Sequence, residues 1–494
     1  MAAAQGANHD RMAPSPSKSA AAGRKMDLKE LGKVRSPNTF LLLIIACSLL
    51  MPISCQSPAP EPNPPEPKPG GPFTIYYALN ESHSNSWVRQ SPTGELGVVY
   101  GVYGPGTGNH DPQKTGELIY RTIMPDGSQH EEAVTTDRGV DKCVLVYDSG
   151  SSPHIFYAHS DNTDQALYHL YKNGGGGWHK ETAVNFASEG GKFIYELSAD
   201  IDKKDSIHLL VLKIRSNPDS DDFLDCYQGA HLYHITNGSG NWKKTLIHHY
   251  DTFYTYDMVV KTQRRQDIAV DSDGHAHVVF GEQYVTPPGQ GHADMARLHY
   301  ATNKSGTWVR EIALTASNTT DDSGWYPSLC LDRTGRPAIA STYVARVVTR
   351  SARYAQLCYS VRSDSGEWRT EVVAERDDGY YGTDGRNYTG ALPHLEFDLN
   401  NRPHIVFSDI ASSHNPQNVF CTGQIRYAVF NGDTWDLSTL YRQPSPRSFY
   451  ECTEMGGQCL VISRNGKRIQ VVGQEMVSTA EDVYTYGLVH FNIE

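Results

Sequence analysis

The sequence predicts an all-β fold, a seven-bladed β-propeller of four-stranded antiparallel blades closed by an N-terminal strand. Three observations support this prediction: one four-strand pattern recurs along the chain, a Gly-bearing turn followed by Trp recurs with it, and the last unit stops one strand short. The repeats have periods of roughly 55–70 residues, and a fixed period of this size in strands is typical of a propeller. Because one blade cannot bury both of its faces alone, we expect the blades to form a ring.

The pattern is clearest in the middle of the chain. A strand over Asp267–Val270 is followed by a tight turn at Asp271–Gly274, where Gly supplies the positive φ. A second strand covers His277–Gly281, and a third covers Leu298–Ala301 after a longer loop. A second turn then leads to Trp308, which opens the fourth strand. Four strands joined in this way predict one antiparallel sheet.

Both turn signals recur. Five of the seven tryptophans follow a Gly-bearing turn: Trp178, Trp242, Trp308, Trp368 and Trp435. The acidic residue of the first turn recurs at Asp148, Asp202, Asp271, Asp332 and Asp398. The predicted units begin near Trp87, Lys142, Tyr195, Gln266, Tyr326, Leu392 and Gln458. The last unit has three strands, so we expect Phe73–Ala78 to supply its fourth and to remove the open sheet edges. Separate β-sandwiches, the alternative, would explain neither the repeat nor the short last unit.

The chain ahead of the repeats has a different composition. We interpret residues 1–55 as a signal or leader segment, 56–72 as a Pro-rich linker and 73–494 as the propeller. The apolar run Thr39–Ile53 follows several basic residues and is short for a membrane-spanning helix, which favours a secretory signal. Cys55 precedes the Pro-rich stretch as in a bacterial lipoprotein, although Pro52 stands where that pattern usually has Leu. An exported location is expected; lipidation at Cys55 and a signal anchor both stay open.

The net charge and the cysteine content limit the possible partners and metal sites of the protein. A net charge of −12 argues against a nucleic-acid partner. Seven cysteines follow the leader, an odd number that leaves at least one thiol unpaired within a single chain: Cys143, Cys226, Cys330, Cys358, Cys421, Cys452 and Cys459. Cys143 and Cys330 lie in apolar strands and are expected to be packed thiols, whereas Cys452 and Cys459 are close enough for a local disulfide. No cysteine spacing indicates a zinc site, so we expect no metal or cofactor. As a separate expectation, the protein is a monomer.

The long loops are the expected place for function, because two kinds of connection open on the same face of a propeller. These loops are rich in His, Tyr and Arg, which suit an acidic polysaccharide: Arg pairs with carboxylates, and Tyr stacks on sugar rings. The candidate substrate-binding residues are Tyr254, Tyr256, Arg264, Arg265, His292 and Tyr381. The alternative is that these loops are simply polar. Four further histidines occupy one repeated position in second strands and are expected to be structural: His154, His208, His277 and His404.

Three segments carry a family resemblance. IFYAHS lies at the end of the second strand of the second blade, FIYELS lies at the start of the third blade, and LKIRS lies at the end of the third blade's second strand. Residues 73–494 resemble a secreted, BNR-type propeller. They differ from sialidases in one respect: the sialidase Asp-box lies between the third and fourth strands of a blade, whereas the Asp-Gly turn of this chain lies between the first and second. The chain is more similar to seven-bladed propeller polysaccharide lyases of the ulvan-lyase type. The positions that match the catalytic residues of those lyases are His159, Tyr195 and Arg215.

The resemblance implies cleavage of a uronate-containing polysaccharide by β-elimination. Arg215 would neutralise the uronate carboxylate, and His159 and Tyr195 would serve as base and acid. One departure is that such lyases also have a His at the start of the second blade, where this chain has Asp141-Lys142. A non-catalytic glycan-binding propeller on the cell surface and a protein-binding propeller therefore remain as alternatives.

Overall fold

The computed structural model divides the chain into two units, Met1–Glu66 and Pro67–Glu494. The structure describes residues 73–78, 87–102, 117–124, 128–135, 137, 140–159, 165–172, 176–189, 193–214, 226–227, 229–250, 253–254, 266–285, 293–315, 322–346, 353–375, 386–415, 418–442, 459–462, 469–480 and 483–493. The leader and the Pro-rich linker, predicted over 1–55 and 56–72, lie outside these residues. Within them, no helix has the length and apolar character needed to cross a membrane.

Five sheets have four antiparallel strands each. Within each sheet the strands are named in the order in which they lie side by side. They are β2 (Trp87–Gln90), β3 (Leu96–Val102), β4 (Glu117–Ile123) and β5 (Gln129–Thr135); β6 (Val140–Tyr147), β7 (Pro153–His159), β8 (Ala166–Lys172) and β9 (Trp178–Asn185); β10 (Phe193–Ile201), β11 (Ile207–Ile214), β13 (Ala230–Thr236) and β14 (Lys243–Tyr250); β16 (Gln266–Val270), β17 (Ala276–Val285), β18 (Ala293–Thr302) and β19 (Val309–Thr315); and β1 (Phe73–Ala78), β30 (Val483–Ile493), β29 (Ile469–Ala480) and β28 (Cys459–Ile462).

A sixth sheet has eight strands. They are β20 (Asp322–Leu331), β21 (Pro337–Arg346), β22 (Arg353–Arg362), β23 (Trp368–Glu375), β24 (Arg386–Phe397), β25 (Pro403–Asn415), β26 (Asn418–Phe430) and β27 (Trp435–Arg442). The described chain also has a two-stranded ladder of β12 (Cys226–Tyr227) and β15 (Phe253–Tyr254), and one short 3-10 helix, η1 (Ala187–Glu189).

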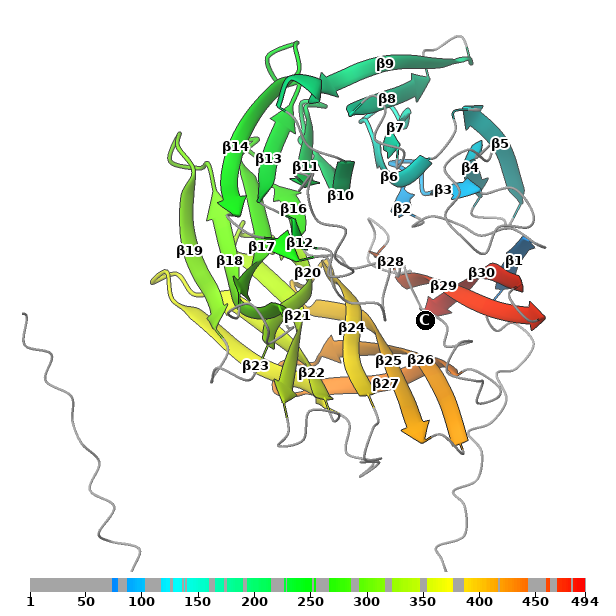
Figure 1. Ribbon diagram of the computed structural model, residues 1–494, viewed down its shortest axis with the longest axis vertical. Helices are drawn as coiled ribbons and strands as arrows, with labels where there is room; N and C mark the ends of the chain where they lie inside the picture. The colour runs from blue at the N-terminus through cyan, green and yellow to red at the C-terminus, as the bar shows by residue number, and fades with distance from the viewer. Residues whose placement is uncertain are drawn as a thin grey trace, which may run out of the picture. The chain divides into compact units, whose positions relative to one another are not determined.

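The all-β propeller of four-stranded antiparallel blades is confirmed, but the described strands do not form seven separate sheets. They form six sheets of four or more strands, because two antiparallel meanders are joined where β22 and β24 pair in parallel. The parallel contact covers only Arg353↔Arg386 and Tyr354↔Asn387. Figure 1 shows the sheets arranged around a centre, with β9, β14, β19 and β23 on the periphery.

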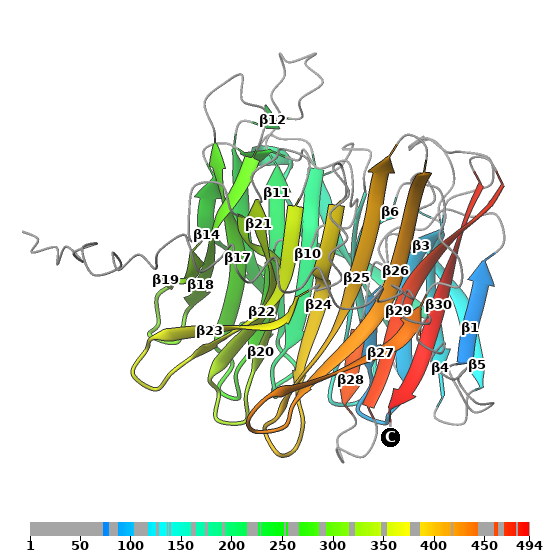
Figure 2. The same ribbon diagram turned by 90° about the horizontal axis from the view of Figure 1, so that it is seen from below.

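The first and last strands of the described chain share one sheet, as the short last repeat predicts. β1 pairs with β30, Phe73 opposite His490 and Ala78 opposite Tyr486, so the predicted pairing of Phe73–Ala78 is confirmed. In the side view of Figure 2, the strands run between two ends of the ring, and β12 lies beyond the end of β11. This is the end at which β7 and β11 finish, so we call it the loop end.

The repeated tryptophans hold neighbouring blades together. Each packs edge-on against an aromatic residue in the third strand of the preceding blade, with ring centroids 5.3–5.6 Å apart: Trp178–Tyr120, Trp242–His169, Trp308–His234, Trp368–Tyr300 and Trp435–Tyr359. Three of the indole groups also donate to a glutamate of that blade: Trp242 to Glu181, Trp368 to Glu311 and Trp435 to Glu371. The Trp repeat is therefore a blade-to-blade contact.

The four repeated histidines are structural, as predicted. Their Nε2 atoms face the acidic residue of the adjacent turn at 3.4–4.0 Å: His154–Asp148, His208–Asp202, His277–Asp271 and His404–Asp398. Their Nδ1 atoms contact the third strand of the same blade: His154–His169, His208–His234, His277–Tyr300 and His404–Tyr427. Both ring nitrogens of these residues thus face groups of the same blade, Nδ1 through a hydrogen bond and Nε2 by proximity to the carboxylate.

The cysteines bear out part of the prediction. Cys143 is a buried free thiol that donates to the Val99 carbonyl over 3.7 Å. Cys330 is also a free thiol, but it is only half-buried and lies beside a carboxylate rather than in a purely apolar site. Cys452 lies outside the described residues, so its disulfide with Cys459 stays a prediction.

Candidate active site

Of the residues predicted to act in catalysis, only His159 has a described side chain. It is the last residue of β7. Tyr195 lies near the start of β10 and Tyr254 in β15, and the structure describes the backbone of these strands but not the two side chains. The other candidates lie outside the described residues: Arg215, Tyr256, Arg264, Arg265, His292 and Tyr381. Arg215 directly follows Ile214, where β11 ends at the loop end.

The imidazole of His159 faces a carboxylate. Its Nε2 lies 3.7 Å from Oδ2 of Asp137, and 13% of the side chain remains exposed. Nε2 itself is buried and forms no hydrogen bond with any described atom. The ring therefore has one nitrogen turned toward an acid inside the protein, while part of the side chain reaches solvent at the loop end.

Asp137 lies between β5 and β6, in the link from one blade to the next. Its Oδ2 accepts hydrogen bonds from the hydroxyl of Tyr157 and the ammonium of Lys180. Burial works to raise the pKa of Asp137, but the hydrogen bonds from Lys180 and Tyr157 outweigh it and hold this pKa below its usual range. Asp137 is therefore an anion at neutral pH. Burial, with the nearby Asp137 carboxylate, raises the pKa of Tyr157, so its hydroxyl stays protonated.

Two tyrosine rings flank the imidazole. The Tyr157 ring centroid is 5.6 Å from that of His159, and the Tyr168 centroid is 5.4 Å away, nearly edge-on. Lys180 Nζ lies 4.0 Å from the Tyr168 centroid and forms an ion pair with Asp137. We call His159, Asp137, Tyr157, Tyr168 and Lys180 the His159 cluster. The sequence analysis identified only its first member; the second-strand position of Tyr157, two residues before His159, was the one available signal for the others.

Bulges occur at the starts of the two inner strands next to this cluster. In β6 the register moves from Val140↔His159 to Lys142↔Ala158, which leaves Asp141 without a partner. In β10 it moves from Ile194↔Lys213 to Glu196↔Leu212, which leaves Tyr195 without one. Register shifts also occur near the starts of β20 and β24, so they recur in the first strands of other blades. Tyr195 is thus the residue of β10 that the ladder with β11 leaves out.

The sequence analysis also missed a buried lysine. Lys213 is only 1% exposed and donates to the carbonyl of Phe186, 3.2 Å away, in the link between β9 and β10. Its backbone pairs with Ile194, the neighbour of Tyr195. A buried ammonium is costly unless it is paired. Lys213 therefore places a buried amino group, bonded to a backbone carbonyl, in β11 two residues before Arg215.

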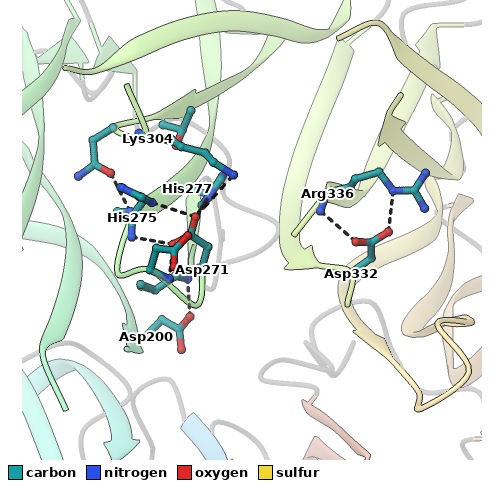
Figure 3. Close-up of polar contacts among 12 residues, drawn as sticks. Asp200, Asp271, His275, His277, Lys304, Asp332 and Arg336 are labelled. Atoms are coloured by element: carbon teal, nitrogen blue, oxygen red, sulfur yellow. Dashed lines mark hydrogen bonds and ion pairs between the residues drawn. The ribbon is translucent and has the colours of Figure 1, made fainter. Parts of the chain in front are cut away.

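One group of side chains has the spacing of a metal site. The ligand atoms of Asp271, Asp273 and His275 lie within 4.8 Å of one another in the turn between β16 and β17. Figure 3 shows Asp271 and His275 in this turn. Asp271 Oδ1 accepts the backbone N–H of His275 at 2.8 Å, and its Oδ2 meets the ring Nδ1 at 3.1 Å. Burial works to raise the pKa of Asp271, but these bonds outweigh it and lower the pKa to about 2.

The same turn recurs with an arginine in place of His275. Arg336 donates to Asp332 through both its backbone N–H and its Nε, at 2.9 and 2.7 Å (Figure 3). Arg402 does the same with Asp398, at 2.8 Å in both bonds. Because a side-chain cation fills this place in two other blades, the Asp271 group is a repeated turn structure rather than a metal centre.

A second cluster of titratable side chains lies on the first strands of different blades, which we call the inner strands. Arg89, Asp200, Cys330 and Glu396 each lie two residues before the first turn of their blade, and we call them the inner-strand cluster. Asp200 accepts the N–H of Val270 at 2.7 Å (Figure 3), and the Cys330 thiol donates to Glu396 over 3.8 Å. Nearby Asp267 accepts from Ser198 Oγ at 2.7 Å and from the N–H of Leu329 at 2.9 Å. These bonds connect successive blades.

Burial dominates the charge state of this cluster. It raises the pKa of Asp200 to about 6 and that of Glu396 to about 7, although Arg89 opposes both shifts. Repulsion adds to burial, since Asp267 raises both values and Asp200 raises that of Glu396. Both side chains are half-buried, and they keep their protons to a higher pH than the same groups in water would.

No protein-family model and no curated protein sequence matches this chain. Several solved structures resemble it in fold. An ulvan lyase shares 10% identity with a TM-score of 0.49, over 84% of this chain and 95% of its own. A Dyadobacter fermentans protein of unknown function shares 12% with a TM-score of 0.44, over 86% and 98%. A Fusarium graminearum α-L-arabinofuranosidase shares 9% with a TM-score of 0.42, over 72% and 93%. At these scores the similarities carry no functional argument.

Proposed function

We propose that this protein is an exported propeller that cleaves an acidic, uronate-containing polysaccharide by β-elimination. The observation that carries the proposal is the environment of His159. A partly exposed imidazole stands at the rigid end of β7, and its buried nitrogen faces an anionic carboxylate at 3.7 Å. A histidine placed in this way can act as a general base.

The reaction needs two further roles. A cation must neutralise the uronate carboxylate so that the C5 proton becomes acidic, and an acid must protonate the leaving oxygen at C4. Arg215 and Tyr195, the residues that the family resemblance indicates, take these roles in the proposal. β10, which contains Tyr195, contacts β6 and, less closely, β7, so Tyr195 and His159 belong to neighbouring sheets that touch. A positioned base or acid typically contributes about 10²–10⁴ in rate.

The proposal extends to architecture and location. The proposal takes each of the two meanders in the eight-stranded sheet as one blade, which would give seven blades closed by β1. The inner strands would then be β2, β6, β10, β16, β20, β24 and β28. Residues 1–55 would direct export, with Cys55 as the candidate lipid anchor, and the Pro-rich linker over 56–72 would act as a tether. The mature protein would be a monomer.

A second function, glycan binding without cleavage, is favoured by one observation. β6 begins Val140-Asp141-Lys142, so no histidine is available opposite His159, where the lyases that the sequence resembles have one. If a second proton-transfer group at that position is indispensable, the same surface would hold an acidic polysaccharide without breaking it.

The test is a screen against ulvan, glycosaminoglycans, alginate and pectin. A lyase produces unsaturated uronates, whose new C4–C5 double bond absorbs in the ultraviolet. His159→Ala should abolish this signal. His154→Ala is the matched control, because His154 lies in the same strand but belongs to the repeated turn structure. Retention of a polymer without cleavage would favour glycan binding, and neither retention nor cleavage would overturn both functions.

A further inference from the structure

We infer that Asp137 is a positioning residue, which keeps the Nε2–H of His159 directed inward and leaves Nδ1 as the nitrogen that meets a substrate. The catalytic meaning of this inference rests on the proposed function. The orientation of the ring and its tautomer do not depend on the proposed function, because they follow from contacts within the protein.

The comparison with the four repeated histidines carries the inference. In each of those, Nε2 faces a turn aspartate and Nδ1 contacts a residue of the third strand; in His154, for example, Nε2 is 3.6 Å from Asp148 and Nδ1 is 2.9 Å from His169. His159 repeats the first contact, with Nε2 3.7 Å from Asp137. For Nδ1 the described residues offer no hydrogen-bonding partner, and only Nε2 is among the buried, unbonded atoms. The exposed part of the side chain therefore leaves Nδ1 accessible.

The surrounding groups fix both partners of the pair. Asp137 is held in place by Tyr157 and Lys180, and the rings of Tyr157 and Tyr168 flank the imidazole. Asp137, Tyr157 and Tyr168 contact the His159 ring directly, and Lys180 contacts Asp137 and both tyrosine rings. A carboxylate opposite Nε2 favours the tautomer with the proton on that atom, so the lone pair lies on Nδ1. When Nδ1 takes the proton from C5 of the uronate, both nitrogens carry hydrogen, and Asp137 stabilises the resulting cation.

The first measurement needs no substrate. Nitrogen NMR of ¹⁵N-histidine-labelled protein, with the His159 signals assigned by their loss in His159→Gln, reports which ring nitrogen carries the proton in the neutral form. We expect the Nε2–H tautomer in the wild type and a mixture of tautomers in Asp137→Asn. Asp137→Glu, which restores a carboxylate, should recover much of the wild-type preference. An Nδ1–H tautomer in the wild type would overturn the inference, even if Asp137→Asn fails to fold.

The second measurement uses whichever polymer is cleaved. Asp137→Asn should lower kcat about 10–100-fold, the cost typical of removing a group that orients a metal-ligating histidine, and should leave KM nearly unchanged. Asp148→Asn is the matched control, because Asp148 faces His154 at almost the same distance, and it should change neither quantity. Wild-type kcat in Asp137→Asn would overturn the positioning role. If no polymer is cleaved, the proposed function fails, whereas the tautomer measurement still decides the orientation.

Discussion

Glu396→Gln should make the protein less sensitive to alkaline pH. Burial raises the pKa of Glu396 from 4.5 to about 7. A raised folded-state pKa means that the folded protein holds a proton which the unfolded chain releases. The stability linked to Glu396 is therefore complete below about pH 4.5 and is lost as the pH rises through about 7. At 1.36 kcal/mol per pH unit, this difference amounts to about 3 kcal/mol above pH 7, and partial exposure of the side chain reduces it to roughly 1–3 kcal/mol.

The assay is urea unfolding of wild type and variant at about pH 4.5 and about pH 8. The amide of Gln mimics the neutral carboxyl group, so the free energies of unfolding should nearly coincide at the lower pH. At the higher pH the variant should be more stable by the amount above. Asp200→Asn should act in the same direction, because burial raises the pKa of Asp200 to about 6. The double variant should gain less than the sum, since Asp200 and Glu396 repel each other. Equal gains at both pH values would refute the reasoning.

Three further predictions concern packing and closure. Trp368→Ala removes the edge contact with Tyr300 and the hydrogen bond to Glu311, and should cost about 3 kcal/mol in urea unfolding; a loss below about 1 kcal/mol would contradict the blade-contact role. Gly390→Ala should lower Tm more than Gly240→Ala, because both glycines have positive φ but only at Gly390 would the new Cβ approach Leu357 Cα, at 2.7 Å; equal losses would count against this. Deleting residues 1–72 should leave the thermal transition intact, whereas deletion through Ala78 should lower Tm by exposing the edge of β30, and identical transitions would argue against closure by β1.

The repeat made most of the fold predictable. The Asp turns and the Trp residues recur at a fixed period, so their positions within a blade follow from the sequence, and Trp368 and His277 lie where that pattern places them. The parallel contact between β22 and β24 could not be predicted. It involves only two residue pairs, near Arg353 and Arg386, and no periodic signal marks them.

The site was less predictable than the fold. His159 could be found because it ends a strand, and strand position follows from the repeat. Asp137 lies in a link between blades, where neither periodicity nor a motif determines its direction, so its contact with His159 emerges only from the folded chain. The inner-strand cluster could have been predicted in part. Aligning the repeats places Asp200, Cys330 and Glu396 at one position, where other blades have Val146 or Ala269.

The most direct test of the central claim is the chemistry of the cleaved bond. Wild-type protein and His159→Ala are incubated with each acidic polymer in water enriched in ¹⁸O, and the products are analysed by mass spectrometry. β-Elimination takes no oxygen from water and leaves a C4–C5 double bond on the new end. We predict unsaturated products without ¹⁸O on the unsaturated ring from the wild type, and no unsaturated products from His159→Ala. Saturated products containing ¹⁸O, or equal cleavage by His159→Ala, would contradict the lyase function and the role of His159.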